Sequence, residues 1–189
     1  MQHNEEVESP SLRGRLIVAS PALVDPNFRK TVVLIAEHTA DGAMGLVLNR
    51  QTPASVADAV PHLTAITGES ALVFVGGPVE RSSVFVLADF ADPAQAGALV
   101  LWDIGLFPPD TEPAEAVRIA RQARVYAGYA GWGPGQLEDE LEEEAWIVAD
   151  PAEEDIFTAE PEKLWSRVLR RKGGHYGVLA LMPDDPRLN

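Results

Sequence analysis

The chain has no cysteine, no long apolar run and, over the acidic residues 137–162, no Lys or Arg. The lack of cysteine excludes disulfides, thiol catalysis, iron–sulfur clusters and cysteine-ligated zinc, and it fits a reducing compartment. No apolar run approaches the roughly 20 residues that a membrane-spanning helix needs. Residues 1–11 are polar and acidic, unlike a signal peptide. We therefore expect a cytoplasmic protein that does not engage a membrane.

Residues 137–162 hold twelve acidic residues and no Lys or Arg, and they dominate the net charge of −14. The rest of the chain contains 17 acidic residues and all 15 basic residues. Such a block attracts cations or basic partners and repels phosphate. Two interpretations stay open: a solvated face that aids solubility, or a docking surface for a basic protein partner over 138–162. The acidic residues concerned are Glu138, Asp139, Glu140, Glu142, Glu143, Glu144, Asp150, Glu153, Glu154, Asp155, Glu160 and Glu162.

The length of 189 residues fits one domain. We expect a disordered arm over 1–10 and a single domain over 11–189. Apolar, β-branched runs predict strands over 12–20, 31–38, 43–49, 71–75, 83–88, 98–103, 125–130, 145–149 and 178–182. Apolar residues at helical spacing and terminal signals predict helices over 55–62, 113–124, 136–144 and 161–172. Strand clusters separated by single helices predict an α+β fold: one compact domain with a mostly antiparallel, barrel-like sheet flanked by a few helices.

Residues 128–138 form a glycine-rich loop between a predicted strand and a predicted helix. This is the layout of a phosphate cradle. Pro134 has no N–H to offer, no Lys-Ser/Thr pair follows, and acidic residues in the first helical turn would repel an anion. The alternative is a tight turn pinned by a buried Trp132. In that turn Gly133 and Gly135 adopt backbone angles that glycine adopts cheaply, and Gly135 allows close strand–helix packing.

A second glycine-containing segment spans 76–83. Its backbone N–H groups, together with the charge of Arg81, could bind an oxyanion. A plain hairpin between the flanking strands explains the same residues, and we favour it. If both glycine loops were functional, the protein would bind a small molecule or a nucleotide phosphate, or act as an enzyme.

The remaining groups of polar residues give little indication of a metal site, a catalytic site or a nucleic-acid interface. The four histidines have no metal-ligand spacing, so we expect neither a metal nor a cofactor. A Ser20–His38–Asp25 triad is conceivable, although no G-x-S-x-G elbow is present. Clusters of arginine and lysine at 118–124 and 170–172 are too modest to predict direct nucleic-acid binding against the net charge.

Five motifs, taken in order, resemble the bacterial YqgE/AlgH family. They are Leu16-Ile17-Val18-Ala19-Ser20-Pro21; Phe28-Arg29-Lys30-Thr31-Val32 with Glu37-His38; Gly42-Ala43-Met44-Gly45-Leu46-Val47-Leu48-Asn49-Arg50; Gly76-Gly77-Pro78-Val79; and Gly128 through Glu138. The resemblance covers about residues 12–174.

The resemblance implies a compact α+β domain with a barrel-like sheet and no established catalytic residue. The family's label marks a regulatory role in exopolysaccharide production and in transcription. The function it implies here is a non-enzymatic regulatory or interaction domain acting through protein or small-ligand contacts. Positions in or beside the motifs are candidates for a shared site and equally for a shared fold: His38, Asn49, Gly76, Gly77, Arg81, Trp132, Gly135 and Gln136.

Overall fold

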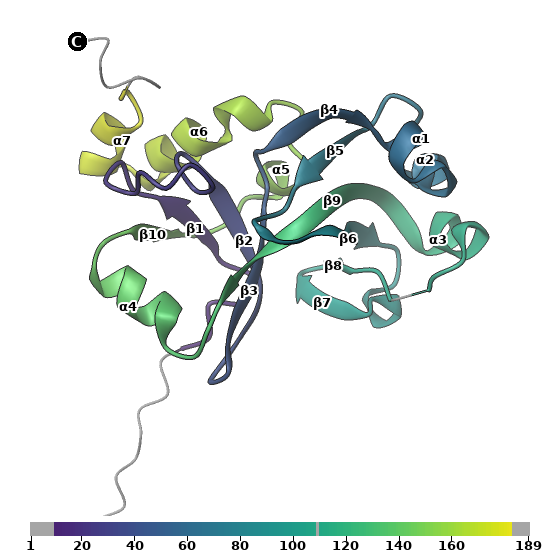
Figure 1. The fold of residues 1–189 in the computed structure, drawn as a ribbon, viewed down its shortest axis with the longest axis horizontal. Helices are drawn as coiled ribbons and strands as arrows, with labels where there is room; N and C mark the ends of the chain where they lie inside the picture. Colours follow the sequence, from purple (N-terminus) through teal and green to yellow (C-terminus); the bar gives the residue numbers. More distant parts are fainter. Residues whose placement is uncertain (1–9, 109, 183–189) are drawn as a thin grey trace, which may run out of the picture.

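The computed structural model describes residues 10–108 and 110–182 (Figure 1). Most of the arm predicted over 1–10, and residues 183–189 of the predicted domain, lie outside these ranges. A 10-stranded sheet organises the fold, in the order β10-β1-β2-β3-β9-β6-β8-β7, with β4 paired to β5 and β5 paired to β9. The strands are β1 (Leu16–Ala19), β2 (Val32–Thr39), β3 (Gly42–Val47), β4 (Gln51–Ser55), β5 (Leu72–Val75), β6 (Val79–Phe90), β7 (Ala98–Leu101), β8 (Ile104–Leu106), β9 (Ala120–Trp132) and β10 (Trp146–Ala149).

Short helices surround the sheet. They are α1 (Val56–Ala59), η1 (Pro61–Leu63), α2 (Thr64–Thr67), η2 (Pro93–Gln95), α3 (Pro113–Ile119), α4 (Gln136–Glu142), α5 (Glu153–Ile156), η3 (Pro161–Lys163), α6 (Leu164–Lys172) and α7 (His175–Leu179). Every strand pair is antiparallel except β5 with β9. The predicted α+β domain with a mostly antiparallel sheet is therefore confirmed. The sheet does not close, so it resembles a barrel only loosely.

The central strands are buried on both faces. Along β1 and β2, alternate residues enter two separate cores, as the period of two in a strand requires. Leu16 and Leu34 join the core beneath α6, whereas Ile17 and Val33 join the core beneath α4. The helices α6 and α4 thus cover opposite faces of this part of the sheet (Figure 1). This double cover explains why the strands read as continuous apolar runs.

The long strand β9 accounts for two corrections. The helix predicted over 113–124 ends at Ile119, and residues 120–124 begin β9. Pairing with β6 overrides their helical spacing: Arg121 forms an ion pair with Asp89 across the two strands. The hairpin favoured for 76–83 is also wrong, because β9 lies between β5 and β6 and pairs with both.

Further differences lie at the edges of the fold. The strand predicted over 178–182 does not form: α7, which packs on α6, ends at Leu179, and residues 180–181 form a turn. The strand β4 contains Pro53 and pairs with β5, on a branch off the main strand path. The hairpin of β2 and β3 is confirmed. Within the described ranges, no helix is long and apolar enough to cross a membrane.

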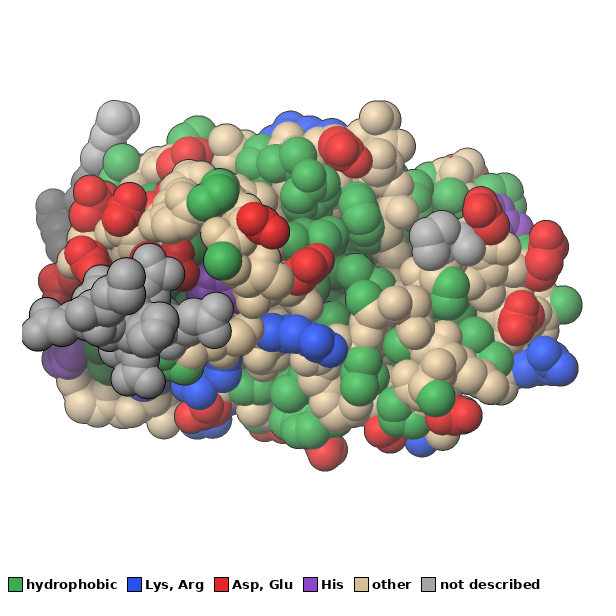
Figure 2. Space-filling model, turned by 90° about the horizontal axis from the view of Figure 1, so that it is seen from below, with side chains coloured by type: hydrophobic (Ala, Val, Ile, Leu, Met, Phe, Trp, Pro, Cys, Tyr) green, Lys and Arg blue, Asp and Glu red, His purple; other side chains and the backbone are tan. Residues whose placement is uncertain are grey.

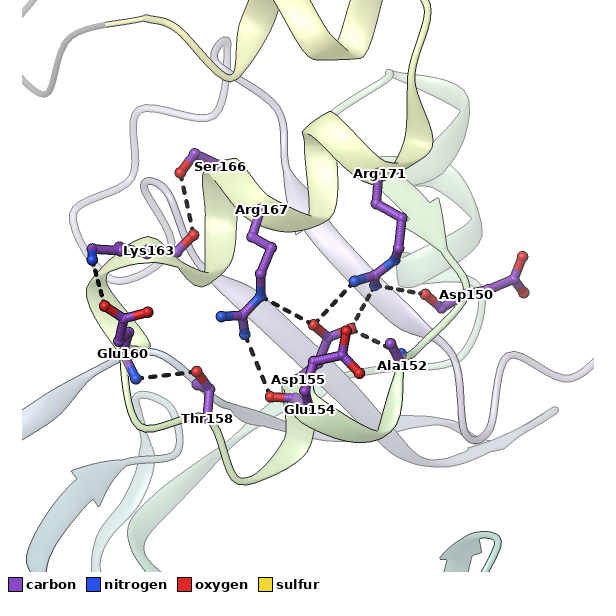
Figure 3. A network of polar contacts seen from close by, with 10 residues as sticks. All are labelled: Asp150, Ala152, Glu154, Asp155, Thr158, Glu160, Lys163, Ser166, Arg167 and Arg171. Carbon is purple, nitrogen blue, oxygen red and sulfur yellow. Dashed lines mark hydrogen bonds and ion pairs between the residues drawn. The ribbon is translucent and has the colours of Figure 1, made fainter.

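A buried carboxylate fastens α5 to α6 (Figure 3). Asp155 is fully buried and forms ion pairs with Arg171 and Arg167 of α6. It also accepts the backbone N–H of Ala152 at 2.9 Å, at the start of α5. One carboxylate therefore holds the N-terminus of one helix and two arginines of another.

Candidate functional site

The structure divides the eight candidate residues into two groups. Trp132, Gly135, Gln136 and His38 lie around the start of α4. The others, Gly76, Gly77, Arg81 and Asn49, lie where β3, β5 and β6 approach one another. Only the second group borders a cavity that contains arginine side chains.

The first group is committed to holding α4. Glu140 Oε2 accepts the indole N–H groups of Trp132 at 2.9 Å and Trp146 at 2.7 Å. Gln136 donates to Glu140 Oε1 at 2.9 Å and accepts the N–H of Gly133 at 3.0 Å. Both indoles are nearly fully buried, at 6% and 4% exposed. The side chains of Trp132 and Gln136 therefore donate to an internal carboxylate.

His38 has both ring nitrogens occupied. Its Nδ1 accepts the backbone N–H of Leu12 at 2.9 Å, which places the ring proton on Nε2, 2.7 Å from Glu138 Oε1. Asp25 accepts the N–H of Asn27 instead. The conceivable Ser20–His38–Asp25 triad does not form. The histidine joins the chain at Leu12 to α4.

The glycines of this loop bear out the architectural reading in part. Gly135 adopts φ 74°, a left-handed conformation that suits glycine, at the position before α4. A Cβ there would meet no atom within 4 Å, so the expected close packing at Gly135 is wrong. Gly133 is not among the residues with positive φ.

Positions 76 and 77 require glycine because the backbone there passes too close to β9 to leave room for a Cβ atom. A Cβ on Gly76 would lie 2.2 Å from the carbonyl oxygen of Gly128, and one on Gly77 would lie 2.1 Å from the carbonyl carbon of Tyr129. Gly76 also donates to the carbonyl of Ala127 at 2.9 Å. This tight crossing carries the chain over β9 from β5 to β6.

Beside this crossing lies a cavity of about 260 Å³, which we call the Arg50–Arg81 pocket. It is lined by Asn27, Val47, Arg50, Gln51, Val75, Gly77, Pro78 and Arg81. Arg50 donates to the carbonyls of Arg29 at 2.7 Å and Pro26 at 3.2 Å, and partial burial lowers its pKa. A guanidinium stays charged even so. The pocket therefore places two fixed positive charges in a strongly acidic protein.

Arg81 reaches the pocket because β6 is irregular. The register of β6 against β9 shifts between Val79 and Val84, and Glu80 adopts φ 48°. Such bulges turn side chains out of the ladder. Arg81 donates to Asn27 Oδ1 at 3.0 Å. The hypothesis that Arg81 supplies the positive charge near Gly77 agrees with this geometry.

Asn49 does not line the pocket, but it precedes Arg50 in the chain and holds the backbone there. Its Oδ1 accepts the N–H of Val32, and its Nδ2 donates to the carbonyl of Lys30, both at 2.9 Å. It thereby fixes the chain beside Arg50. Sequence reasoning missed Asn27 and Arg50 as site residues, although Arg50 ends a quoted motif; only the fold shows that they meet Arg81.

The acidic region is partly used inside the molecule. Five of its side chains have internal partners: Glu138, Glu140, Asp150, Asp155 and Glu160. Exposed carboxylates remain on α4 and just after it, and on α5. Figure 2 shows acidic side chains gathered at the end of the molecule that carries α4.

A further cavity, of about 580 Å³, has mainly apolar walls between η1, β6 and β8, and none of the candidate residues lines it. In the part of the chain that the structure describes, no group of three or more potential metal ligands comes together.

The fold and these motif positions define a single α+β domain on an open, mostly antiparallel sheet. A family model described as AlgH-like matches residues 16–177, and the chain belongs to this family. A UPF0301 protein of Streptomyces avermitilis is 44% identical over 188 residues, covering 96% of this chain and 97% of that protein. A UPF0301 protein of Chlorobaculum tepidum is 38% identical over 182 residues, covering 93% and 95%.

Two solved structures share the fold. A crystal structure of a protein from Corynebacterium diphtheriae superposes with a TM-score of 0.82 at 25% identity and covers 96% of this chain and 95% of its own. The solution structure of the AlgH protein from Pseudomonas aeruginosa gives 0.69 at 27% identity, covering 98% and 100%. The resemblance to the YqgE/AlgH family that the motifs indicate is thus confirmed. The names of these relatives do not state a biochemical activity.

Proposed function

We propose that the protein is a non-enzymatic regulatory domain that binds a small anionic ligand in the Arg50–Arg81 pocket. The observation that carries the proposal is the pair of guanidinium groups at one cavity, each oriented by an oxygen acceptor. Arginine forks match carboxylate and phosphate oxygens. A volume of about 260 Å³ suits a ligand near the small end of the usual range.

The same geometry favours this site over the other glycine loop. Residues 128–138 use their polar groups to hold α4, whereas residues 76–83 supply one wall of the pocket. The candidate triad is not assembled. Binding therefore has better support than catalysis.

A thermal-shift titration tests the proposal, with inorganic phosphate and malonate as probes and chloride to match ionic strength. A ligand at 100 times its dissociation constant adds about 2.7 kcal/mol of stability. We expect both probes, or one of them, to raise the melting temperature of the wild type and not of Arg81→Gln. Arg118→Gln, an exposed change on α3, is the control and keeps the response. An unresponsive wild type, or an undiminished response in Arg81→Gln, contradicts the proposal.

As a second function we propose docking of a basic protein partner on the acidic region. The supporting observation is that Glu142, Glu143 and Glu144 are consecutive and exposed at the end of α4. A lysine-rich peptide serves as probe in a fluorescence titration. Neutralising Glu142 and Glu143 to glutamine should weaken binding more than neutralising Glu112 and Glu115 at the start of α3, which removes the same number of charges. Equal losses would mean that only net charge matters.

We also propose that the protein resides in the cytoplasm and regulates without contacting DNA directly. The net charge of −14 supports this, because DNA binding requires a basic surface. Titration with duplex DNA at low and moderate salt should show no binding. Sequence-specific binding with a steep salt dependence would overturn this view.

A further inference from the structure

One side of β6 has no neighbouring strand near Val84. Strand β9 pairs with β6 from Val84 to Phe90, whereas β8 pairs only with residues 87–89 of β6. Next to this short ladder, Phe107 donates its backbone N–H to the carbonyl of Val86 at 3.0 Å, and the chain then leaves the sheet. Val84 therefore lies past the last contact between β6 and the β8 segment.

The backbone N–H and C=O of Val84 point to this open side. Along an antiparallel strand, the backbone groups of successive residues point alternately to the two neighbouring strands. The carbonyl of Val86 accepts from Phe107 on the β8 side, so the groups of Val84, two residues away, point the same way. Ala127, which lies opposite Val84 in β9, agrees with this, because its carbonyl accepts from Gly76 and not from β6. Among the residues that the structure describes, no other segment donates to or accepts from the backbone of Val84.

A cavity lies along this open side. It is the cavity of about 580 Å³ between η1, β6 and β8, and its walls include Val84, Phe85 and Val86. Its volume is within the range of about 300–1,000 Å³ that is typical of ligand sites. Val84 is 49% exposed, so its side chain is only half covered. We call this space the β6-edge cavity, and no residue lines both it and the Arg50–Arg81 pocket.

The walls determine which side chains the cavity accepts. Val86 packs with Val60 and Leu63 on one face of β6. Directly opposed residues of paired strands point to the same face, so a side chain opposite Val84 would lie on this apolar face. The described lining residues include Asp110 and no Lys or Arg. Apolar side chains flanked by a basic one therefore complement the cavity.

We infer that the β6-edge cavity binds an extended peptide, which adds a strand to β6 in line with β8. The peptide runs antiparallel to β6, and its residue opposite Val84 exchanges two backbone hydrogen bonds with Val84. The side chain of that residue is apolar and lies toward Leu63, and a Lys or Arg near one end of the peptide lies toward Asp110. A second copy of the chain fits less well, because its own β6 edge also lies between walls from η1 and the segment after β8.

The test is an NMR titration of the full chain with the peptide acetyl-Lys-Thr-Leu-Thr-Leu-Thr-Lys-amide at constant ionic strength. We expect saturable shifts, with the amide proton of Val84 moving downfield as it gains a hydrogen bond. N-methylation of both leucines removes the peptide donors that face β6 and should weaken binding about tenfold or more. N-methylation of two threonines, whose N–H groups point away from β6, is the matched control and should weaken binding much less.

Variants of the protein test the same contact from the other side. Val84→Pro removes the open N–H, which the pairing with β9 does not use, and should weaken binding about fivefold or more. Val84→Lys is the second variant in case proline disturbs β6, and it should weaken binding because it repels the basic peptide. Val117→Lys is the control: Val117 is 47% exposed on α3, does not line the cavity, and should bind the peptide as the wild type does.

Three results would overturn the inference. They are a titration that does not saturate, equal binding of the parent and the leucine-methylated peptide, and normal binding by both Val84→Pro and Val84→Lys. Equal losses from leucine and threonine methylation would also overturn it, because they would show apolar contact without strand pairing. Phosphate and malonate, the probes of the Arg50–Arg81 pocket, should not compete with the peptide, so failure here and failure of the proposed function are distinguishable.

Discussion

Replacement of Asp155 by alanine should destabilise the protein more than any other single charge removal in the acidic region. Asp155 is the fully buried carboxylate that accepts from Arg171 and from the N–H of Ala152 and forms an ion pair with Arg167. Its removal leaves two guanidinium groups without their carboxylate partner and the N–H of Ala152 without its acceptor. The ion pairs between α5 and α6 are lost, and among the described polar contacts only the hydrogen bond from Arg167 to the carbonyl of Glu154 still joins the two helices (Figure 3).

The magnitude follows from the exposure of the partners. Removing one member of a buried ion pair costs about 3–5 kcal/mol. The side chains of Arg167 and Arg171 are 31% and 36% exposed, so they regain part of their hydration in the variant. We therefore expect Asp155→Ala to lower the free energy of unfolding by about 3 kcal/mol, near the lower end of that range. Asp155→Asn keeps an acceptor and should lose less.

Urea denaturation at neutral pH measures this loss as a fall in the transition midpoint at constant m-value. The control is Asp150→Ala: its side chain is 84% exposed and pairs with Arg15 at 3.0 Å. An exposed pair contributes little, so the control should stay within about 0.5 kcal/mol of the wild type. A loss below about 1 kcal/mol for Asp155→Ala, or equal losses in both variants, would refute the reasoning.

Four further predictions are each checked by the same denaturation assay. Trp132→Ala should lower the free energy of unfolding by about 3–5 kcal/mol because the indole is 6% exposed. Gly135→Val should lower it by about 1–2 kcal/mol because φ 74° disfavours a side chain. Wild-type midpoints would contradict both predictions. Gly76→Ala should abolish the folded state, since its Cβ would lie 2.2 Å from the Gly128 carbonyl oxygen, and a cooperative wild-type transition would contradict this. Burial raises the pKa of Tyr126 to about 12, so the folded protein keeps a proton that the unfolded chain releases near pH 10. Stability should be full below about pH 10 and fall toward pH 12 in the wild type but less in Tyr126→Phe; equal falls would mean that other groups dominate.

The interior of the fold was predictable where one segment contains its own signal. The apolar runs of β1 and β2, and the turn at Gly42, placed the first strands and their hairpin. The partners of each strand were not predictable, because pairing depends on residues far apart in sequence. Residues 120–124 illustrate this: their helical spacing is genuine, but the pairing with β6 determines their structure.

The candidate site was predictable only in part for the same reason. The pattern of residues 76–83 predicts Arg81 and Gly77 together as candidate site residues. In the structure, Asn27 and Arg50 from two other segments line the same pocket. The glycine-rich motif also predicts Trp132 and Gln136 as candidate site residues. Both donate hydrogen bonds to Glu140, a contact that no local sequence pattern indicates. A motif shows that residues matter together, but only their contacts show whether they serve the fold or a ligand.

The distribution of charge supports our proposal that an anion binds in the Arg50–Arg81 pocket. In a chain with a net charge of −14, an anion is repelled at long range and binds only where local positive charge is fixed. Arg50 is oriented by two backbone carbonyls and partly buried, so its position does not depend on a mobile surface contact. A protein that needed only solubility could leave this charge in solvent. The partly buried Arg50 beside Arg81 therefore supports the proposed ligand site, whereas glycine at Gly76 and Gly77 is explained by the close approach to β9.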